Sequence, residues 1–106
     1  MDTARVLARA GAPEWTVVVA EEQTGGRGRL GRRWYSPRGG LWMSVVLRPR
    51  LETGRTHLLN IAGALAVRDA VRSSYGVNAY LKWPNDVLVG GRKLACLLYT
   101  SPSPRD

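Results

Sequence analysis

Glycine and arginine alternate between residues 23 and 34, and these residue types suit an anionic ligand. The stretch reads Gln23-Thr24-Gly25-Gly26-Arg27-Gly28-Arg29-Leu30-Gly31-Arg32-Arg33-Trp34. Glycine lets the backbone approach a ligand closely, and the planar guanidinium group of arginine presents paired donors to a phosphate or a carboxylate. The GxxxxGK[ST] order of a P-loop is absent. Composition leaves two alternatives open: a disordered RGG-like arm that grips nucleic acid, or a loop that orders over a small anionic ligand.

The segments on either side of this loop favour the small ligand. Residues 15–20 combine a tryptophan with β-branched residues, which predicts a strand that enters the loop. Residues 41–47 are apolar on both sides, which predicts a second strand placed centrally in a sheet. A loop held between two strands is typical of a binding site on a folded scaffold.

The charge of the chain is concentrated in the same region. The formal net charge is +8, and no acidic residue occurs between Arg27 and Arg50. Such a patch attracts anions. A solvated basic face without a specific partner is the alternative, but the interleaved glycines carry an ordering entropy that a merely soluble surface has no reason to bear.

A second candidate for chemistry is Lys82, in the stretch Lys82-Trp83-Pro84-Asn85-Asp86. Residues 79–82 are predicted to form a strand, and Pro84 favours an extended Trp83 and ends the strand ladder. Gly90-Gly91 then predicts a hairpin between two further strands. An ammonium group fixed at a strand end can neutralise a carboxylate or a phosphoryl oxygen. A plain surface lysine is the alternative.

Two helices complete the predicted fold. One begins near Asp2 and ends at Gly11, with Val6, Leu7 and Ala10 as its buried stripe. The other spans about 55–75 and ends at Gly76. Helix, strand, loop, strand, long helix and hairpin together predict an α+β fold, in which helices pack on a mixed β-sheet.

Composition bounds the remaining possibilities. A chain of 106 residues makes one domain at most. No apolar stretch approaches the ~20 residues of a membrane span, and no signal peptide is recognisable. The single Cys96 excludes an internal disulfide and a cysteine-based metal site, and no metal-ligating residues are predicted. We therefore expect a reducing, cytoplasmic location.

Both motifs resemble hallmarks of the biotin protein ligases. The first is the glycine–arginine loop with its flanks, residues 20–32, followed by Trp34-Tyr35-Ser36-Pro37 and Gly39-Gly40-Leu41-Trp42. The second is the Lys82–Asp86 stretch, and the resemblance runs from about Asp2 to Ala95. It implies the catalytic core that these enzymes share with class II aminoacyl-tRNA synthetases, here in part.

The resemblance also implies an activity. The family joins biotin to ATP, with Mg²⁺, to give biotinyl-5′-adenylate, and then passes biotin to a lysine of a carboxylase carrier domain. It implies that Gln23, Arg27, Gly28, Arg29 and Lys82 bind the substrates, and that Lys82 and Arg29 are catalytic. The carrier domain is the expected protein partner, a homodimer stays open, and neither a membrane nor a nucleic acid is expected as a partner.

The chain also departs from the family pattern. The Ser/Thr-rich segment with an asparagine that precedes the first helix in the family is missing or cut, and Cys96 stands where the family has glycine. We expect residues 1–95 to be a partial biotin/lipoate ligase catalytic domain and residues 96–106 to be a non-native Pro/Ser tail. We expect this fragment by itself to be inactive.

Two other functions remain as alternatives. A lipoate-type protein ligase would share the fold and the adenylation chemistry, although the arginine-dense loop argues against it. A non-enzymatic module that binds nucleic acid would explain the basic charge, but it has no need of the Lys82–Asp86 stretch.

Overall fold

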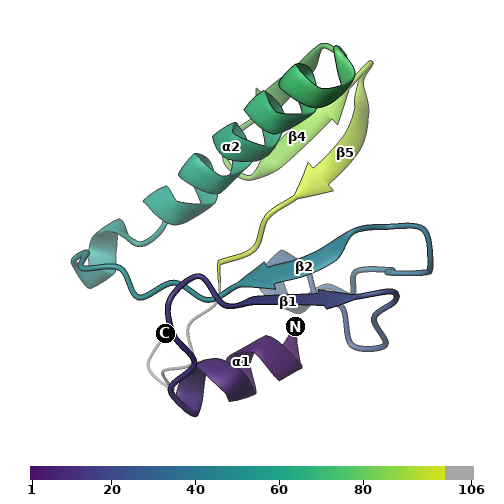
Figure 1. Ribbon diagram of the computed structural model, residues 1–106. Helices are drawn as coiled ribbons and strands as arrows, with labels where there is room; N and C mark the ends of the chain where they lie inside the picture. Colours follow the sequence, from purple (N-terminus) through teal and green to yellow (C-terminus); the bar gives the residue numbers. More distant parts are fainter. Residues whose placement is uncertain (100–106) are drawn as a thin grey trace. The chain divides into compact units, whose positions relative to one another are not determined.

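The computed structural model describes residues 1–99, which form two compact units, residues 1–50 and 51–99. Each unit contains one α-helix and one antiparallel sheet (Figure 1). This confirms the predicted α+β class. The sheet pairings that the structure describes are all antiparallel, so the mixed sheet expected from the sequence is not seen among residues 1–99.

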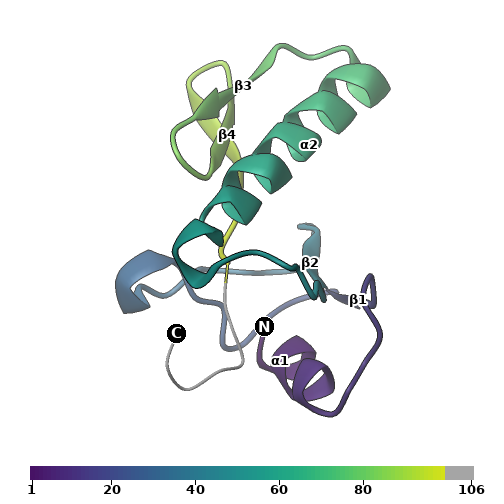
Figure 2. The same cartoon turned by 90° about the vertical axis from the view of Figure 1, so that its left-hand side faces the viewer.

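The first unit contains helix α1 (Asp2–Arg9) and strands β1 (Val17–Ala20) and β2 (Trp42–Val45). Val17 pairs with Val45, and Ala20 pairs with Trp42. Helix α1 lies beside this two-stranded ribbon (Figures 1 and 2). In the described part of the chain β2 pairs with β1 alone, so the central position predicted for this strand is not seen. Its apolar run instead leaves Met43 half exposed.

The predicted buried stripe of the first helix is wrong. Val6 is 64% exposed and Leu7 is 39% exposed, whereas Ala4 is buried. Ala4 and Ala8 line a small cavity of about 90 Å³ between α1 and β2, so the helix faces the strand with its alanines. The 3.6-residue period alone does not show which side of a short helix will face the strand.

Arg48 ties the end of the ribbon to the end of α1. Its Nη2 donates to the carbonyl oxygens of Ala8 at 2.9 Å and Ala12 at 2.6 Å, and its Nε donates to Ala12 O at 3.2 Å. Its main-chain N–H donates to Glu14 Oε2 at 2.8 Å. The guanidinium group therefore joins the last turn of α1 and the loop that follows it to the end of the ribbon.

The second unit packs helix α2 (Leu58–Tyr75) on one face of the sheet β3–β4–β5 (Figure 2). The strands are β3 (Ala79–Lys82), β4 (Asp86–Val89) and β5 (Arg92–Cys96). Ala64, Ala79 and Val87 form the core and are fully buried. Gly76 ends α2 in the left-handed conformation, as predicted, and Gly90 and Gly91 form the tight β4–β5 turn with φ of +58° and +79°.

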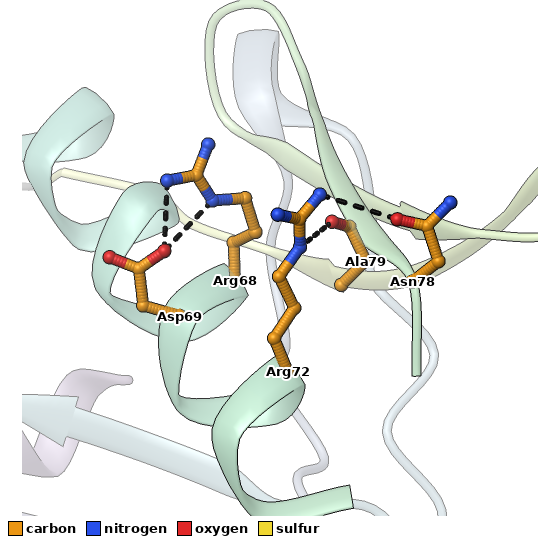
Figure 3. A network of polar contacts seen from close by, with 5 residues as sticks. All are labelled: Arg68, Asp69, Arg72, Asn78 and Ala79. Atoms are coloured by element: carbon orange, nitrogen blue, oxygen red, sulfur yellow. Dashed lines mark hydrogen bonds and ion pairs between the residues drawn. The ribbon is translucent and has the colours of Figure 1, made fainter. Parts of the chain in front are cut away.

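Arg72 connects the last turn of α2 to the start of β3 (Figure 3). Its Nε donates to Ala79 O at 2.7 Å and its Nη2 donates to Asn78 Oδ1 at 3.3 Å. One turn earlier, Arg68 pairs with its neighbour Asp69, with Nη2 2.8 Å from Oδ1. Arg72 therefore fixes the position at which β3 leaves the helix, and Arg68 takes no part in that contact.

Neither helix of the described residues is long and apolar enough to cross a bilayer. Of the predicted tail, residues 96–106, the part from 100 to 106 lies outside the described residues. Cys96 ends β5, and Leu97 packs against the core of the second unit.

Candidate functional site

The glycine–arginine loop is a folded irregular hairpin that connects β1 and β2. Isolated bridges pair Gln23 with Ser36 and Arg27 with Arg33. Backbone hydrogen bonds cross the loop at three levels: Gln23 N to Ser36 O at 2.9 Å, Trp34 N to Gly26 O at 2.9 Å, and Gly28 N to Arg32 O at 2.6 Å. The loop is therefore a shaped scaffold for its side chains and not a free arm.

Gly26 lies where the two sides of this hairpin leave no room for a side chain. A Cβ atom at this position would lie 2.5 Å from the carbonyl oxygen of Trp34 and 2.6 Å from Ser36 Oγ. Distances below 3.0 Å require atoms to move, and the Trp34 oxygen belongs to the backbone. The hairpin closes at this level because residue 26 has no side chain.

Ser36 holds the side chain of Gln23 in place. Gln23 Nε2 donates to Ser36 Oγ at 3.1 Å, and Ser36 Oγ in turn donates to Trp34 O at 3.2 Å. Ser36 is buried, with 3% exposure. No local pattern of the sequence predicts this role of Ser36, because its partner lies 13 residues away across the loop.

The arginine side chains of the loop that the structure describes are exposed. Arg27 Nη2 lies 3.7 Å from Asp2 Oδ2, and both side chains are more than half exposed. Such a pair contributes little stability, so a ligand anion can replace Asp2 at small cost. Arg38 pairs with Glu21 at 2.9 Å, also in an exposed position. Arg29 is the first residue of the short 3₁₀ helix η1 (Arg29–Gly31) at the tip of the loop.

Lys82 and a carboxylate lie side by side on the face of the β3–β4–β5 sheet that is turned away from α2. Its strand partner across β3–β4 is Asp86. Ala79 and Val87 face α2 and are fully buried, so the alternation of the strands places Lys82 and Asp86 on the opposite face. Lys82 is exposed and Asp86 is partly buried, with 16% of its side chain exposed.

A second lysine reaches the same carboxylate. Lys93 Nζ lies 3.5 Å from Asp86 Oδ2. The pairing of β4 and β5 shifts register between Val87 and Leu88, so that Leu88 lies opposite Lys93 while Val87 lies opposite Ala95. The extra residue of this bulge, Leu94, turns Lys93 toward the face that carries Asp86. Lys82, Asp86 and Lys93 thus form a charged cluster, of which only Lys82 was predicted as a site residue.

The predicted site residues are distributed over both units. Gln23, Arg27, Gly28 and Arg29 belong to one loop of residues 1–50, whereas Lys82 belongs to the sheet of residues 51–99. The cavity between α1 and β2 contains none of them. Within residues 1–99, no three His, Cys, Asp or Glu side chains gather as a metal site would require.

The chain belongs to the biotin/lipoate A/B protein ligase family, whose sequence model matches residues 7–104. It is 42% identical over 105 residues to the bifunctional ligase/repressor BirA of Bacillus subtilis, covering 98% of this chain and 32% of that protein. It is 44% identical over 86 residues to the biotin--[acetyl-CoA-carboxylase] ligase of Paracoccus denitrificans, covering 79% of this chain and 36% of that protein. The resemblance inferred from the two motifs is confirmed, and the chain spans about a third of the length of these relatives.

Solved structures of the same family share the fold. The biotin protein ligase from Aquifex aeolicus in complex with biotin and ATP matches 91% of this chain and 41% of its own, with a TM-score of 0.77 and 36% identity. The enzyme from Leishmania major in complex with biotinyl-5-AMP matches 87% of this chain and 44% of its own, with a TM-score of 0.72 and 32% identity. The α+β arrangement described above is therefore part of the biotin protein ligase catalytic core.

Proposed function

We propose that this chain carries part of the catalytic core of an ATP-dependent biotin protein ligase. The enzyme would form biotinyl-5′-adenylate from biotin and ATP and then transfer biotin to a lysine of a carboxylase carrier domain. The observation that carries this proposal is the likeness, over nine-tenths of the chain, to a ligase solved with biotin and ATP.

The first step brings the carboxylate of biotin to the α-phosphate of ATP, and both groups are negative. Much of its barrier is therefore electrostatic, and fixed cations lower it most effectively where water is excluded. Arg27 and Arg29 are the proposed cations of the loop, Gly28 would let the backbone approach the ligand, and Gln23 would present its Ser36-bound amide to biotin.

Lys82 is the proposed cation of the sheet, and the structure supports a wider cluster. Asp86 lies between the two lysines, opposite Lys82 in register and 3.5 Å from the ammonium group of Lys93. One carboxylate with two ammonium groups leaves a net positive charge on this face. We propose that Lys82 and Lys93 together neutralise the oxygens of the reacting carboxylate and phosphate, and that Asp86 holds Lys93 in place.

No nucleophilic side chain of this chain is needed for either step. The mixed anhydride of the adenylate is already activated, and the incoming amine belongs to the carrier domain. The described residues do not fit a dedicated Mg²⁺ site, so an ion that accompanies ATP would be held chiefly by phosphate oxygens and water. We likewise propose that the carrier domain is the protein partner, that the protein can form a homodimer and that it is cytoplasmic.

Calorimetric titration of the chain with biotin, lipoate and a generic oligonucleotide, each with and without ATP, tests this function. Biotin is expected to bind, and ATP is expected to strengthen its binding. Binding of lipoate in preference to biotin would make the protein a lipoate-type ligase. Salt-sensitive binding of the oligonucleotide alone would support the nucleic-acid module instead, since neutralising phosphates releases counterions.

A further inference from the structure

Asn85 is buried in the turn between β3 and β4, directly before Asp86, with 4% exposure. Its side-chain Nδ2 donates to Leu97 O at 2.8 Å, and its own carbonyl oxygen accepts from Leu97 N at 2.9 Å. Nδ2 also lies 3.5 Å from Cys96 Sγ. Two hydrogen bonds therefore join the turn to the residue that follows β5.

Leu97 is itself anchored in the core of the second unit. It packs against the buried cluster of Ala64, Ala79 and Val87. It also fills the space above Gly63 of α2, where a Cβ atom would lie 2.5 Å from Leu97 Cδ2. Leu97 thus contributes its side chain to the core, whereas its main chain makes the hydrogen bonds to Asn85.

We propose that Asn85 is a positioning residue that holds Asp86 between Lys82 and Lys93. Asp86 lies opposite Lys82 on one side and opposite Cys96 on the other. The two bonds from Asn85 to Leu97 continue the β4–β5 pairing one step beyond Asp86, so the backbone of Asp86 is held on both sides. Its carboxylate then stays within reach of Lys93.

A purely structural role would look different. If Asn85 only stabilised the core, another substitution in the core with the same loss of stability would disturb the charged cluster equally. If Asn85 positions Asp86, loss of its hydrogen bond should disturb the Asp86–Lys93 pair, while loss of the Leu97 side chain should not, because that side chain makes none of the bonds to Asn85. This distinction can be measured.

The first experiment does not depend on the proposed activity. The ammonium signals of Lys93 are recorded by NMR in the full chain with ¹⁵N-labelled lysine, and Asp86→Asn gives their position when the pair is lost. Asn85→Asp and Asn85→Ala are expected to move the Lys93 signals toward that position, since neither side chain can donate to Leu97 O. Asn78→Asp is the matched control, because Asn78 is an exposed asparagine of the same unit, and it should leave the signals in place.

Leu97→Ala serves as the control for lost stability. It should lower the unfolding temperature and leave the Lys93 signals unchanged. The proposal is overturned if the Asn85 variants leave the Lys93 signals unchanged, or if Leu97→Ala moves them equally. It is also overturned if both Asn85 variants fail to fold while Leu97→Ala folds, since Asn85 would then be a residue of the core alone.

The second experiment rests on the proposed function. The affinity for biotin in the presence of ATP is measured for Asn85→Ala, Lys93→Gln and the double variant. Because Asn85 would act through the pair that Lys93 forms, the double variant is expected to bind biotin no more weakly than Lys93→Gln. If the losses of affinity in the two single variants multiply in the double variant, the proposal is contradicted. If the unaltered chain binds no biotin, the proposed function fails, and the NMR comparison still decides the role of Asn85.

Discussion

The ammonium group of Lys93 lies 3.5 Å from the carboxylate of Asp86, across the bulge that shifts the register of β4 and β5. Asp86 also lies opposite Lys82 on the next strand. Two lysines on one face of a sheet are therefore available, in the proposed function, to meet the reacting oxygens together. Their separate contributions can be measured.

Lys82→Ala and Lys93→Ala should each raise the barrier to adenylation. Loss of one electrostatic donor that acts in the transition state raises a barrier by roughly 2.7–4 kcal/mol. The measurement is biotin-dependent exchange of pyrophosphate into ATP, in a chimera that places this chain within the Bacillus subtilis relative. A rate loss of about tenfold or less, ~1.4 kcal/mol, would make the lysine concerned a structural residue.

The same chimera tests what the chain needs around it. Because the chain spans about a third of the length of its relatives, we expect residues 1–106 alone to show no sustained transfer of biotin to a carrier domain. About two thirds of the length of those relatives has no counterpart in this chain, and a small ligand depends on burial from most sides. The chimera should recover transfer. Robust biotinylation by the chain alone would contradict this expectation.

Arg29→Gly in the chimera should weaken control of the intermediate rather than its formation. Arg29 begins η1 at the tip of the loop, and closing a loop over a reactive mixed anhydride excludes water and other acceptors. We expect the variant to form biotinyl-adenylate and to release it, so that lysines of bystander proteins become biotinylated. Mass spectrometry of a mixture of carrier domain and serum albumin measures this, and unchanged selectivity for the carrier would exclude the role.

Gly26→Ala should distort the hairpin that holds Gln23. The added Cβ would lie 2.5 Å from Trp34 O and 2.6 Å from Ser36 Oγ, and overpacking of this kind costs roughly 1–3 kcal/mol. Unfolding temperature and biotin affinity should both fall. Gly25→Ala is the matched control, because the nearest atom to its Cβ would be Asp2 Oδ2 at 3.9 Å. Equal effects of the two substitutions would show that Gly26 has no special place in the loop.

Arg48→Met should destabilise the first unit. Its guanidinium group makes three hydrogen bonds to the carbonyl oxygens of Ala8 and Ala12, and a hydrogen bond to a charged group contributes about 1.5 kcal/mol or more. A loss of 1 kcal/mol lowers the unfolding temperature of a domain of this size by about 4–8 °C. Arg50→Met, at an exposed arginine nearby, is the control in the same thermal unfolding experiment. A shift no larger than that of Arg50→Met would contradict the prediction.

The strands and the long helix could be predicted because their signals are local. Gly76 and the Gly90-Gly91 pair have the positive φ values that helix ends and tight hairpins require, and the elements they delimit lie where the pattern predicted them. The first helix was placed correctly, but its buried side was not. Val6 and Leu7 are more apolar than Ala4, yet the side of α1 that faces β2 carries Ala4 and Ala8.

The charged cluster could be predicted only in part. The Lys82–Asp86 stretch marks the place, but the contribution of Lys93 depends on the bulge at Leu94, and strict alternation along β5 cannot show an extra residue. The positioning roles of Ser36 and Asn85 were not predicted, for a related reason. Each forms its decisive hydrogen bond across a turn or a loop, with a partner that no periodicity of the sequence indicates.

The tight β4–β5 turn also bears on how this protein folds. The residues that build and hold the charged cluster all lie between 63 and 97, and the cluster itself lies between 82 and 93. Contacts between residues so near in sequence close with little loss of chain entropy, and hairpins of this kind form in about 1–10 μs. The positive face of Lys82 and Lys93 is therefore expected among the earliest structures on the folding pathway, before the arginine loop closes between strands more than twenty residues apart.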